Sequence, residues 1–459
     1  MSIRFIHAAD LHIDSPMKNL KESDVETGTR ASESTRLAFA ELTRVAMERE
    51  VAFLIVAGDI FDGAWDSVET RNWTLARFHE LNDAGIDVYI VYGNHDKKNP
   101  ILRDRRLQFP PRVKVFSDSS PETFVKEYYD SHSGTSVLAA LHGQSYPNEK
   151  CPENLAEGYP QRVPNAFNIG VLHTDLSGKG SNYAPVDLGT LNSKEYQYWA
   201  LGHQHARETI QEKPSWIGYS GVLQARHINE INPEGCGCYL VEIEDENTIG
   251  SHQFIPCDQL RWRREAFDLS EVETEEELKE LVIERVGAIL DSPELYFKPD
   301  GAEKRFVVAR LVFEGRTKLY NWIKEVDVNA LRDYLESWLS LYRGFAIEKI
   351  EWRVHSKREE SEYIGGSIAM IREIFEKRVK RLEDLSERIN AGEADPVELQ
   401  RYADVKKLSE LRKKFSDSRV DLKTDDDDSI DFNSPDLYVR WYKEAEEILI
   451  NEICNRAKE

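Results

Sequence analysis

The 459-residue sequence is short of cysteine, of basic charge and of long apolar runs, and each shortage excludes a class of protein. Its five cysteines include no CxxC pair, which excludes a disulfide framework and a zinc ribbon. A formal net charge of -23 argues against a protein that neutralises phosphates through clustered Lys and Arg. The longest apolar run, at residues 51–57, is too short to cross a membrane, and the chain opens without a signal-peptide pattern. We therefore expect a cytoplasmic protein.

The length and the apolar content predict two or three folded domains of the α/β class. Short apolar segments first alternate with amphipathic stretches, as in βαβαβ units, at 3–8, 34–49, 53–57, 68–84 and 88–91. Further strands are expected at 136–141, 167–172, 198–201, 236–244 and 252–256. The pattern then changes, and helices at 275–290 and 329–341 with strands at 305–313 and 345–354 predict a small second α/β domain. Charged helices at 364–390 and 396–415 follow it.

Five of the predicted strands of the first domain end in residues of the kinds that bind metals. These residues are Asp10 and His12, Asp59 and Asp62, Asn94 to Asp96, His173, and His203 with His205. The carboxyl ends of parallel strands meet at one edge of a sheet, so these side chains can converge. Carboxylate and imidazole ligands without cysteine suit manganese, iron or zinc. Glycines at 58, 93 and 202 let the backbone turn sharply beside the ligands.

Two metal ions about 3.5 to 4 Å apart can clamp the attacking and leaving oxygens of a phosphodiester. Such a pair needs one shared carboxylate, and we expect Asp59 to bridge the ions. The ordered set Asp10-x-His12, Gly58-Asp59-x-x-Asp62, Gly93-Asn94-His95-Asp96, His173 and Gly202-His203-x-His205 resembles the calcineurin-like metallophosphoesterase pattern. Within that superfamily, the segments 5–12, 141–146 and 202–205 resemble SbcD/YhaO-type DNA repair exonuclease subunits.

The resemblance covers residues 1–257 and implies a calcineurin-like β-sandwich flanked by helices. It further implies an α/β capping domain at 258–357 and partner-binding C-terminal helices within 358–459. One metal ion, for which we expect Mn²⁺, would be held by Asp10, His12, Asp59 and His205. A second would be held by Asp59, Asn94, His173 and His203. The resemblance also implies that His95 acts as a general acid or stabilises the transition state, with Asp62 holding its protonated form.

The implied activity is two-metal cleavage of DNA, by an exonuclease or endonuclease subunit that works with an SbcC-like coiled-coil ATPase; a homodimer is a possible assembly. Two alternatives remain open: a phosphatase or cyclic-nucleotide phosphodiesterase on the same scaffold, and a scaffold without catalysis that recruits an ATPase to DNA. Asp96 after His95 favours the nuclease branch, because protein phosphatases of the superfamily usually carry Glu there.

Two further residues, His142 and Arg226, are candidates for lining the substrate path, with a surface role equally open. Arg261, Arg263 and Arg264 are candidates for phosphate contact, or for a charged strand edge that resists aggregation.

The last predicted helix begins after Ser434 and follows an acidic linker at 425–428. Its apolar stripe consists of Leu437, Tyr438, Trp441, Tyr442, Ala445, Ile448 and Leu449. The stripe either packs on its own domain or, as the resemblance implies, docks on the ATPase.

Overall fold

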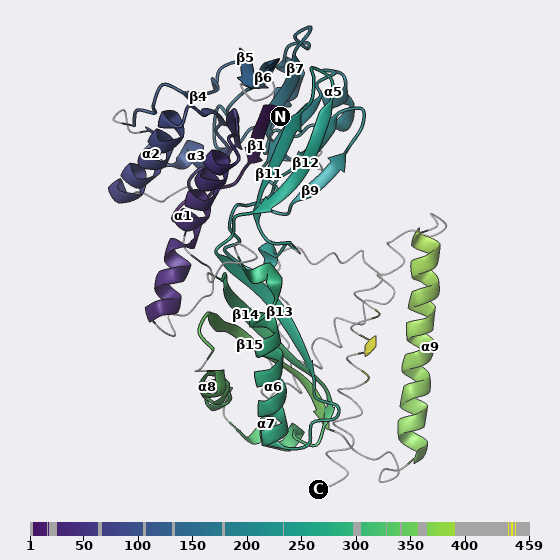
Figure 1. Cartoon of the computed structure of the whole chain (residues 1–459). Coiled ribbons are helices and arrows are strands. Elements are labelled where there is room, and N and C mark those ends of the chain that lie inside the picture. The colour runs from purple at the N-terminus through teal and green to yellow at the C-terminus, as the bar shows by residue number, and fades with distance from the viewer. Residues whose placement is uncertain are drawn as a thin grey trace. The chain divides into compact units, whose positions relative to one another are not determined.

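A computed structural model provides the structure of the chain (Figure 1). It describes residues 3–15, 17, 25–62, 67–103, 107–130, 134–176, 180–232, 234–296, 304–326, 328–339, 342–356, 365–390, 439, 442–443 and 446. The chain forms two compact units, of which the first contains Met1–Arg263, Leu290–Ala309 and Gly344–Glu348. The second contains Arg264–Ile289, Arg310–Arg343 and Lys349–Glu459. The division into domains at 1–257, 258–357 and 358–459 stays a prediction.

The first unit is built on two six-stranded mixed sheets. The order of the first sheet is β12 (Ile249–Pro256), β11 (Gly237–Ile243), β1 (Ile3–Ala8), β2 (Phe53–Ala57), β3 (Asp87–Val91) and β4 (Val113–Val115). Strands β1 to β4 are parallel, whereas β11 is antiparallel to both of its neighbours. The order of the second sheet is β5 (Glu122–Asp130), β6 (Thr135–Gly143), β7 (Phe167–His173), β8 (Tyr198–Gly202), β10 (Trp216–Tyr219) and β9 (Glu208–Gln211). Its four central strands are parallel, and β5 and β9 are antiparallel edges.

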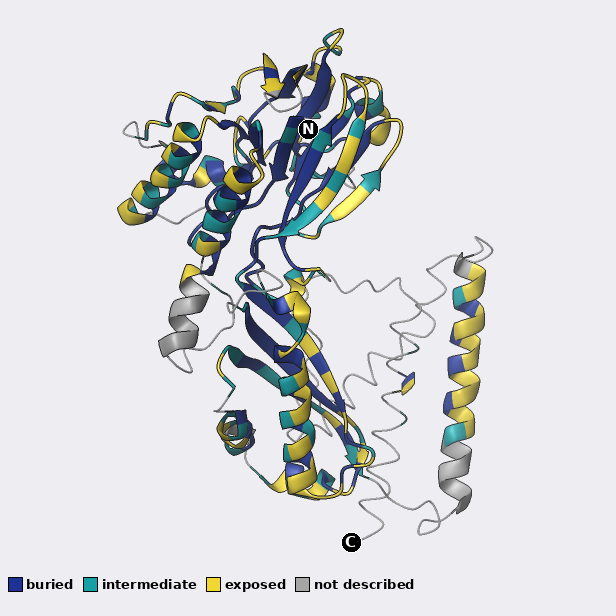
Figure 2. Cartoon of the chain, viewed as in Figure 1, coloured by how far each residue is buried: buried dark blue, intermediate teal, exposed yellow. Residues whose placement is uncertain are grey.

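The central strands are buried on both faces, which explains why their sequences are continuous apolar runs (Figure 2). On the inner face of the sandwich, Phe5 stacks on Phe53 at 5.0 Å and meets the edge of Tyr198 from the second sheet at 5.2 Å. On the outer face of the first sheet, Leu54 and its neighbours pack in one cluster with Phe39 of the first helix. The two sheets are thereby fixed face to face, with helices outside.

The helices of the first unit lie between its strands along the chain. They are α1 (Val25–Glu48), α2 (Val68–Asp83), α3 (Asn94–Lys98), α4 (Pro100–Arg103) and α5 (Leu188–Asn192), with 3-10 turns η1 (Leu155–Gly158), η2 (Ile228–Glu230) and η3 (Pro293–Leu295). Helix α2 begins after Ser67, whose hydroxyl accepts a hydrogen bond from the Thr70 amide, as an N-cap residue does.

The expected α/β fold class is confirmed, and most predicted elements of the first unit are present within a few residues. Helix α1 begins nine residues before the expected Ser34, and four strands were not expected: β4, β5, β9 and β10.

A three-stranded sheet in the order β13 (Leu260–Asp268), β14 (Phe306–Thr317) and β15 (Phe345–Ser356) follows the sandwich along the chain. The boundary between the two units falls within each of these strands. The second unit also contains α6 (Glu275–Leu290) except for its last residue, α7 (Tyr320–Glu325), α8 (Val328–Leu339) and α9 (Gly365–Asn390). None of the helices in the described part of the chain has the length and apolar character needed to traverse a bilayer.

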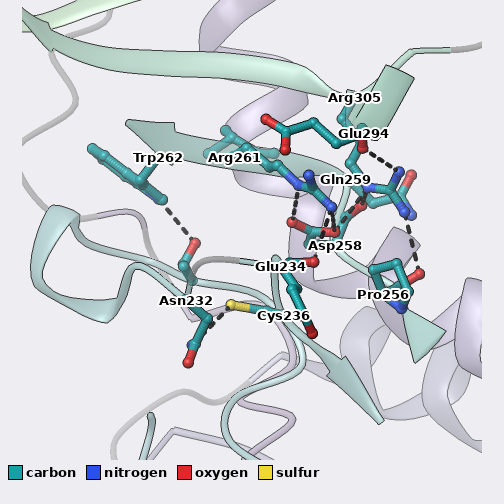
Figure 3. Close-up of polar contacts among 12 residues, drawn as sticks. Asn232, Glu234, Cys236, Pro256, Asp258, Gln259, Arg261, Trp262, Glu294 and Arg305 are labelled. Atoms are coloured by element: carbon teal, nitrogen blue, oxygen red, sulfur yellow. Dashed lines mark hydrogen bonds and ion pairs between the residues drawn. The ribbon is translucent and has the colours of Figure 1, made fainter. Parts of the chain in front are cut away.

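A buried ionic network lies where the chain leaves β12 for β13, within the first unit (Figure 3). Asp258, whose side chain is 2% exposed, accepts hydrogen bonds from Arg261 Nε at 2.9 Å and from Arg305 Nε at 2.8 Å. Arg305 also donates to the carbonyl of Pro256 at 3.2 Å. Arg261 therefore lies in a structural ion pair in the described part of the chain, although phosphate contact by Arg261, Arg263 and Arg264 remains untested.

The predicted C-terminal stripe is described at one residue, Tyr442. Its ring is buried and lies 6.2 Å from the ring of Phe375 in α9, with the Arg378 guanidinium 5.8 Å from its centre. Tyr442 therefore packs within its own unit, which is the first of the two alternatives for the stripe. The predicted helix at 396–415, the linker at 425–428 and the stripe residues Leu437, Tyr438, Trp441, Ala445, Ile448 and Leu449 lie outside the described residues.

Candidate metal centre

The candidate ligands lie at or just after the ends of five parallel strands, three in one sheet and two in the other. Hydrogen bonds between backbones tie the first two loops together: Asp10 N donates to Gly58 O at 2.9 Å, and His12 N to Asp59 O at 3.1 Å. The loop after β8 joins them because His203 N donates to the Asp10 carboxylate at 3.0 Å. The ligand-bearing loops of both sheets therefore meet at one edge of the sandwich, as expected.

Asp10, His12 and His205 form a first ligand group, with one potential ligand atom of each within 4.8 Å of the others. Asp10 Oδ1 and both ring nitrogens of His12 are buried and accept or donate no hydrogen bond among the described residues. Burial raises the pKa of Asp10 to about 6 and lowers that of His12 well below its usual value. Buried polar atoms without partners are costly, and a divalent cation among them would supply the missing interaction. The donor set therefore fits a metal ion.

Asp10, Asp59 and His173 form a second group by the same distance criterion. His173 Nδ1 lies 2.9 Å from the Ala57 carbonyl, which can only accept, so this nitrogen carries the proton. His173 Nε2 faces Asn94 Oδ1 at 3.0 Å and Asp59 Oδ2 at 3.4 Å. Three potential acceptors thus face one another, and a second proton on the ring or a cation between them would supply the missing positive partner.

The electrostatics of this second group favour positive charge. Burial alone would lower the pKa of His173, but the charge of Asp59 raises it to about 9. His203, whose ring centre lies 5.2 Å from that of His173, has a pKa lowered by burial to about 4. His203 is therefore neutral near pH 7 and has a lone pair available for a metal ion.

The backbone around the ligands has an unusual conformation that aims their side chains inward. Asp10, His12, Asp59 and His203 all have positive φ, of 50°, 41°, 53° and 102°. A side chain at Gly93 would overlap the Asp59 carboxylate and the His173 ring, so glycine is required there.

His95 and Asp62 form an ion pair beside the first ligand group, with His95 Nδ1 2.6 Å from Asp62 Oδ1. The hydrogen bond to Asp62 raises the pKa of His95 above its usual value. The His95 side chain is 38% exposed and its ring centre lies 5.1 Å from that of His12. His12, Asp62 and His95 also satisfy the metal-group distances, so an acid role for His95 in place of a ligand role stays a prediction.

The two residues predicted to line the substrate path are both buried. His142 is 0% exposed, and its ring nitrogens lie 2.9 Å from Thr123 Oγ1 and 3.0 Å from Asn168 Oδ1. Arg226 is 4% exposed and contacts polar side chains around the candidate centre. Substrate binding by either residue stays a prediction that none of these contacts supports.

Asp96 was included in a sequence motif without being given a structural role, and Glu230 and Ser15 were not included in the predicted site. Asp96 is buried and accepts hydrogen bonds from the amides of Ile60, Phe61 and Gly93 at 2.8, 3.2 and 3.0 Å. It therefore joins the loops after β2 and β3, and burial raises its pKa to about 7. The signal for Asp96 was its place in the run Gly93 to Asp96. Glu230 and Ser15 lie outside any recognisable motif.

The chain is similar to known metallophosphoesterases in the region that contains this centre. Residues 3–207, which contain every candidate ligand, match the calcineurin-like phosphoesterase family, and residues 262–355 match the middle domain of metallophosphoesterase YhaO. The uncharacterized metallophosphoesterase YhaO of Bacillus subtilis is 29% identical over 92% of this chain and 97% of its own length. The DNA double-strand break repair protein Mre11 of Methanopyrus kandleri is 24% identical over 61% of this chain and 62% of its own.

Proposed function

Because the chain belongs to the calcineurin-like metallophosphoesterases, is YhaO-like and is related to the Mre11 nucleases, we propose that it hydrolyses phosphodiester bonds of DNA with two divalent metal ions. As a metallophosphoesterase it has candidate metal sites of the dimetal kind. The observation that carries the proposal is the convergence of both ligand groups next to the His95–Asp62 ion pair. Ligands for two ions and a proton donor are the parts that this hydrolysis needs.

In the proposed site, Asp10, His12, Asp59 and His205 would hold one ion, and Asp59, Asn94, His173 and His203 would hold the other. Bound divalent ions would stabilise negative charge on the phosphate and make water more acidic. The hydrogen bond to Asp62 raises the pKa of His95 and so favours its protonated form, which would donate a proton to the leaving oxygen. The backbone amide of His95 also donates to Asp59 Oδ1 at 3.0 Å, which fixes the position of His95 relative to the Asp59 carboxylate.

DNA as the substrate is supported by the relation to Mre11, which is named as a DNA double-strand break repair protein. A second region of the chain, 262–355, matches the middle domain of metallophosphoesterase YhaO. We propose that this region is a capping domain along the DNA path. The direct test is cleavage of end-labelled duplex DNA by metal-stripped protein supplied with Mn²⁺, with a phosphotyrosine mimic as the rival substrate. We expect DNA fragments and little phosphatase turnover. Efficient hydrolysis of the mimic without cleavage of DNA would instead identify a phosphatase.

Manganese is the metal we propose, because mixed imidazole and carboxylate ligands suit it. A chelator should abolish cleavage, and Mn²⁺ added in excess should restore it. Undiminished cleavage by metal-stripped protein, with Mg²⁺ also absent, would contradict a metal-dependent mechanism.

We further propose that the C-terminal helices bind an SbcC-like coiled-coil ATPase, as the resemblance of the sequence to SbcD/YhaO-type subunits implies. Truncation after Lys423 should leave metal binding and cleavage of a small phosphodiester intact while it removes co-purification with the cognate ATPase. Unchanged affinity of the truncated protein for that ATPase would place the docking surface in the preceding helices or in the region 262–355.

A further inference from the structure

We infer that Arg226 and Glu230 are positioning residues that connect the ligand His205 with the acid pair His95–Asp62. We call these two side chains the Arg226–Glu230 bridge. The inference rests on the proposed function, because it concerns the same metal-dependent hydrolysis. Both residues lie between the matched regions 3–207 and 262–355, in a part of the chain that neither family match covers.

One end of the bridge fixes the orientation of His205. Glu230 Oε1 lies 2.8 Å from His205 Nδ1, and the glutamate side chain is 14% exposed. A carboxylate oxygen accepts hydrogen bonds, so His205 Nδ1 carries the proton that it donates to Glu230. The lone pair is then on Nε2, which is the ring nitrogen left for a metal ion. A carboxylate in this position usually sets both the tautomer and the basicity of a metal-binding histidine.

The other end of the bridge reaches the acid pair. Arg226 Nη1 donates to Ser15 Oγ at 2.9 Å and lies 3.5 Å from Asp62 Oδ2. Ser15 Oγ in turn donates to the same Asp62 oxygen at 2.8 Å. Asp62 Oδ1 is thereby left to face His95 Nδ1. The guanidinium and the serine hydroxyl therefore hold the carboxylate in the rotation that pairs it with the histidine.

Arg226 and Glu230 are also held to each other. Arg226 Nη2 donates to Glu230 Oε1 at 3.2 Å, and the Arg226 amide donates to Glu230 Oε2 at 2.7 Å. A guanidinium has several donors in a rigid planar arrangement, so it can contact both ends at once, whereas a lysine ammonium has a single nitrogen. A displacement of either residue should thus change the orientation of both the His205 ring and the Asp62 carboxylate.

The test compares Mn²⁺ affinity and turnover in folded, metal-stripped variants of the full chain. Glu230→Gln should weaken Mn²⁺ binding by about 10- to 100-fold in calorimetric titrations, although every proposed ligand is retained. Arg226→Lys should lower kcat for DNA cleavage at saturating Mn²⁺, because a lysine cannot contact Glu230 and Ser15 together. In the combined variant, Mn²⁺ affinity and kcat should each be little lower than in the single variant that lowers that quantity more. Effects of residues that act as a unit are not additive.

The matched control is Glu234→Gln, which changes a glutamate that is 67% exposed and paired with Arg207. It should keep the Mn²⁺ affinity and kcat of the unaltered protein. If Glu230→Gln does not fold, Glu230→Asp retains the charge while withdrawing the carboxylate from His205, and it should also bind Mn²⁺ more weakly. Unchanged Mn²⁺ affinity in a folded Glu230 variant, or full additivity with Arg226→Lys, would overturn the inference. Failure of the unaltered protein to cleave DNA would refute the proposed nuclease activity alone, since the titrations need no substrate.

Discussion

Substitution of His95 and of Asp59 should separate the proton donor from the metal ligands. His95→Asn removes the imidazole that faces Asp62 at 2.6 Å, while both groups that contain Asp10 keep all their members. The variant should keep its metal ions and lose about 10² to 10⁴ in kcat, the usual contribution of a general acid. That loss corresponds to about 2.7 to 5.4 kcal/mol of transition-state stabilisation.

Asp59→Ala should behave differently because Asp59 is the proposed shared ligand. The aspartate is 1% exposed, faces His173 Nε2 at 3.4 Å and accepts from the His95 amide at 3.0 Å. Its removal should therefore lower metal occupancy and activity together. The assay is elemental analysis of folded protein after dialysis, combined with single-turnover cleavage of labelled DNA.

A matched control for His95→Asn is Lys98→Gln, on an exposed side chain of the same helix that pairs with Glu149. It should retain both metal content and rate. Equal metal loss in the His95 and Asp59 variants would show that His95 is a ligand, as the group His12, Asp62 and His95 geometrically permits.

Two further outcomes follow from the charges described above. The pKa of His95 is raised by Asp62, so the protonated acid persists to higher pH; in Asp62→Asn the decline of kcat with rising pH should begin at lower pH, and an unchanged pH profile would contradict the assigned pair. Asp258→Ala leaves two buried arginines without their carboxylate and should cost about 3 to 5 kcal/mol in unfolding free energy. Urea unfolding measures that change, and a midpoint equal to that of the unaltered protein would show that the ion pairs contribute no stability.

Much of the sandwich could be predicted because its central strands are apolar on both faces and are bounded by polar loops. Strand β2 was predicted to the residue on this basis. Strands β9 and β10 were not expected, because each has only four residues and a proline lies between them. Strand β5 is an edge strand with mostly exposed or half-buried residues, so its hydrophobic signal is weak.

The ligand types were predictable because each follows a strand whose end is fixed by the fold. The contact of Glu230 with His205 was not predictable, because it spans 25 residues and depends on how the segment that contains β9, β10 and η2 folds back. The burial of His142 also depends on tertiary packing, since its ring is stacked on Tyr196 at 4.3 Å. Sequence spacing therefore located residues that lie together in the candidate groups, whereas it gave no sign of contacts such as that of Glu230 with His205.

Asp10, His12, Asp59 and His203 have positive φ angles, which lower the stability of the fold at the four positions where the proposed activity needs these side chains. Residues other than glycine in sparsely populated regions cost of order 1 to 3 kcal/mol each. Glycine would relieve that cost at any one of them, but it would delete a ligand. Selection for a more stable protein alone would therefore erode the metal centre one residue at a time, whereas selection for hydrolysis maintains four local conformations that the rest of the sandwich must stabilise.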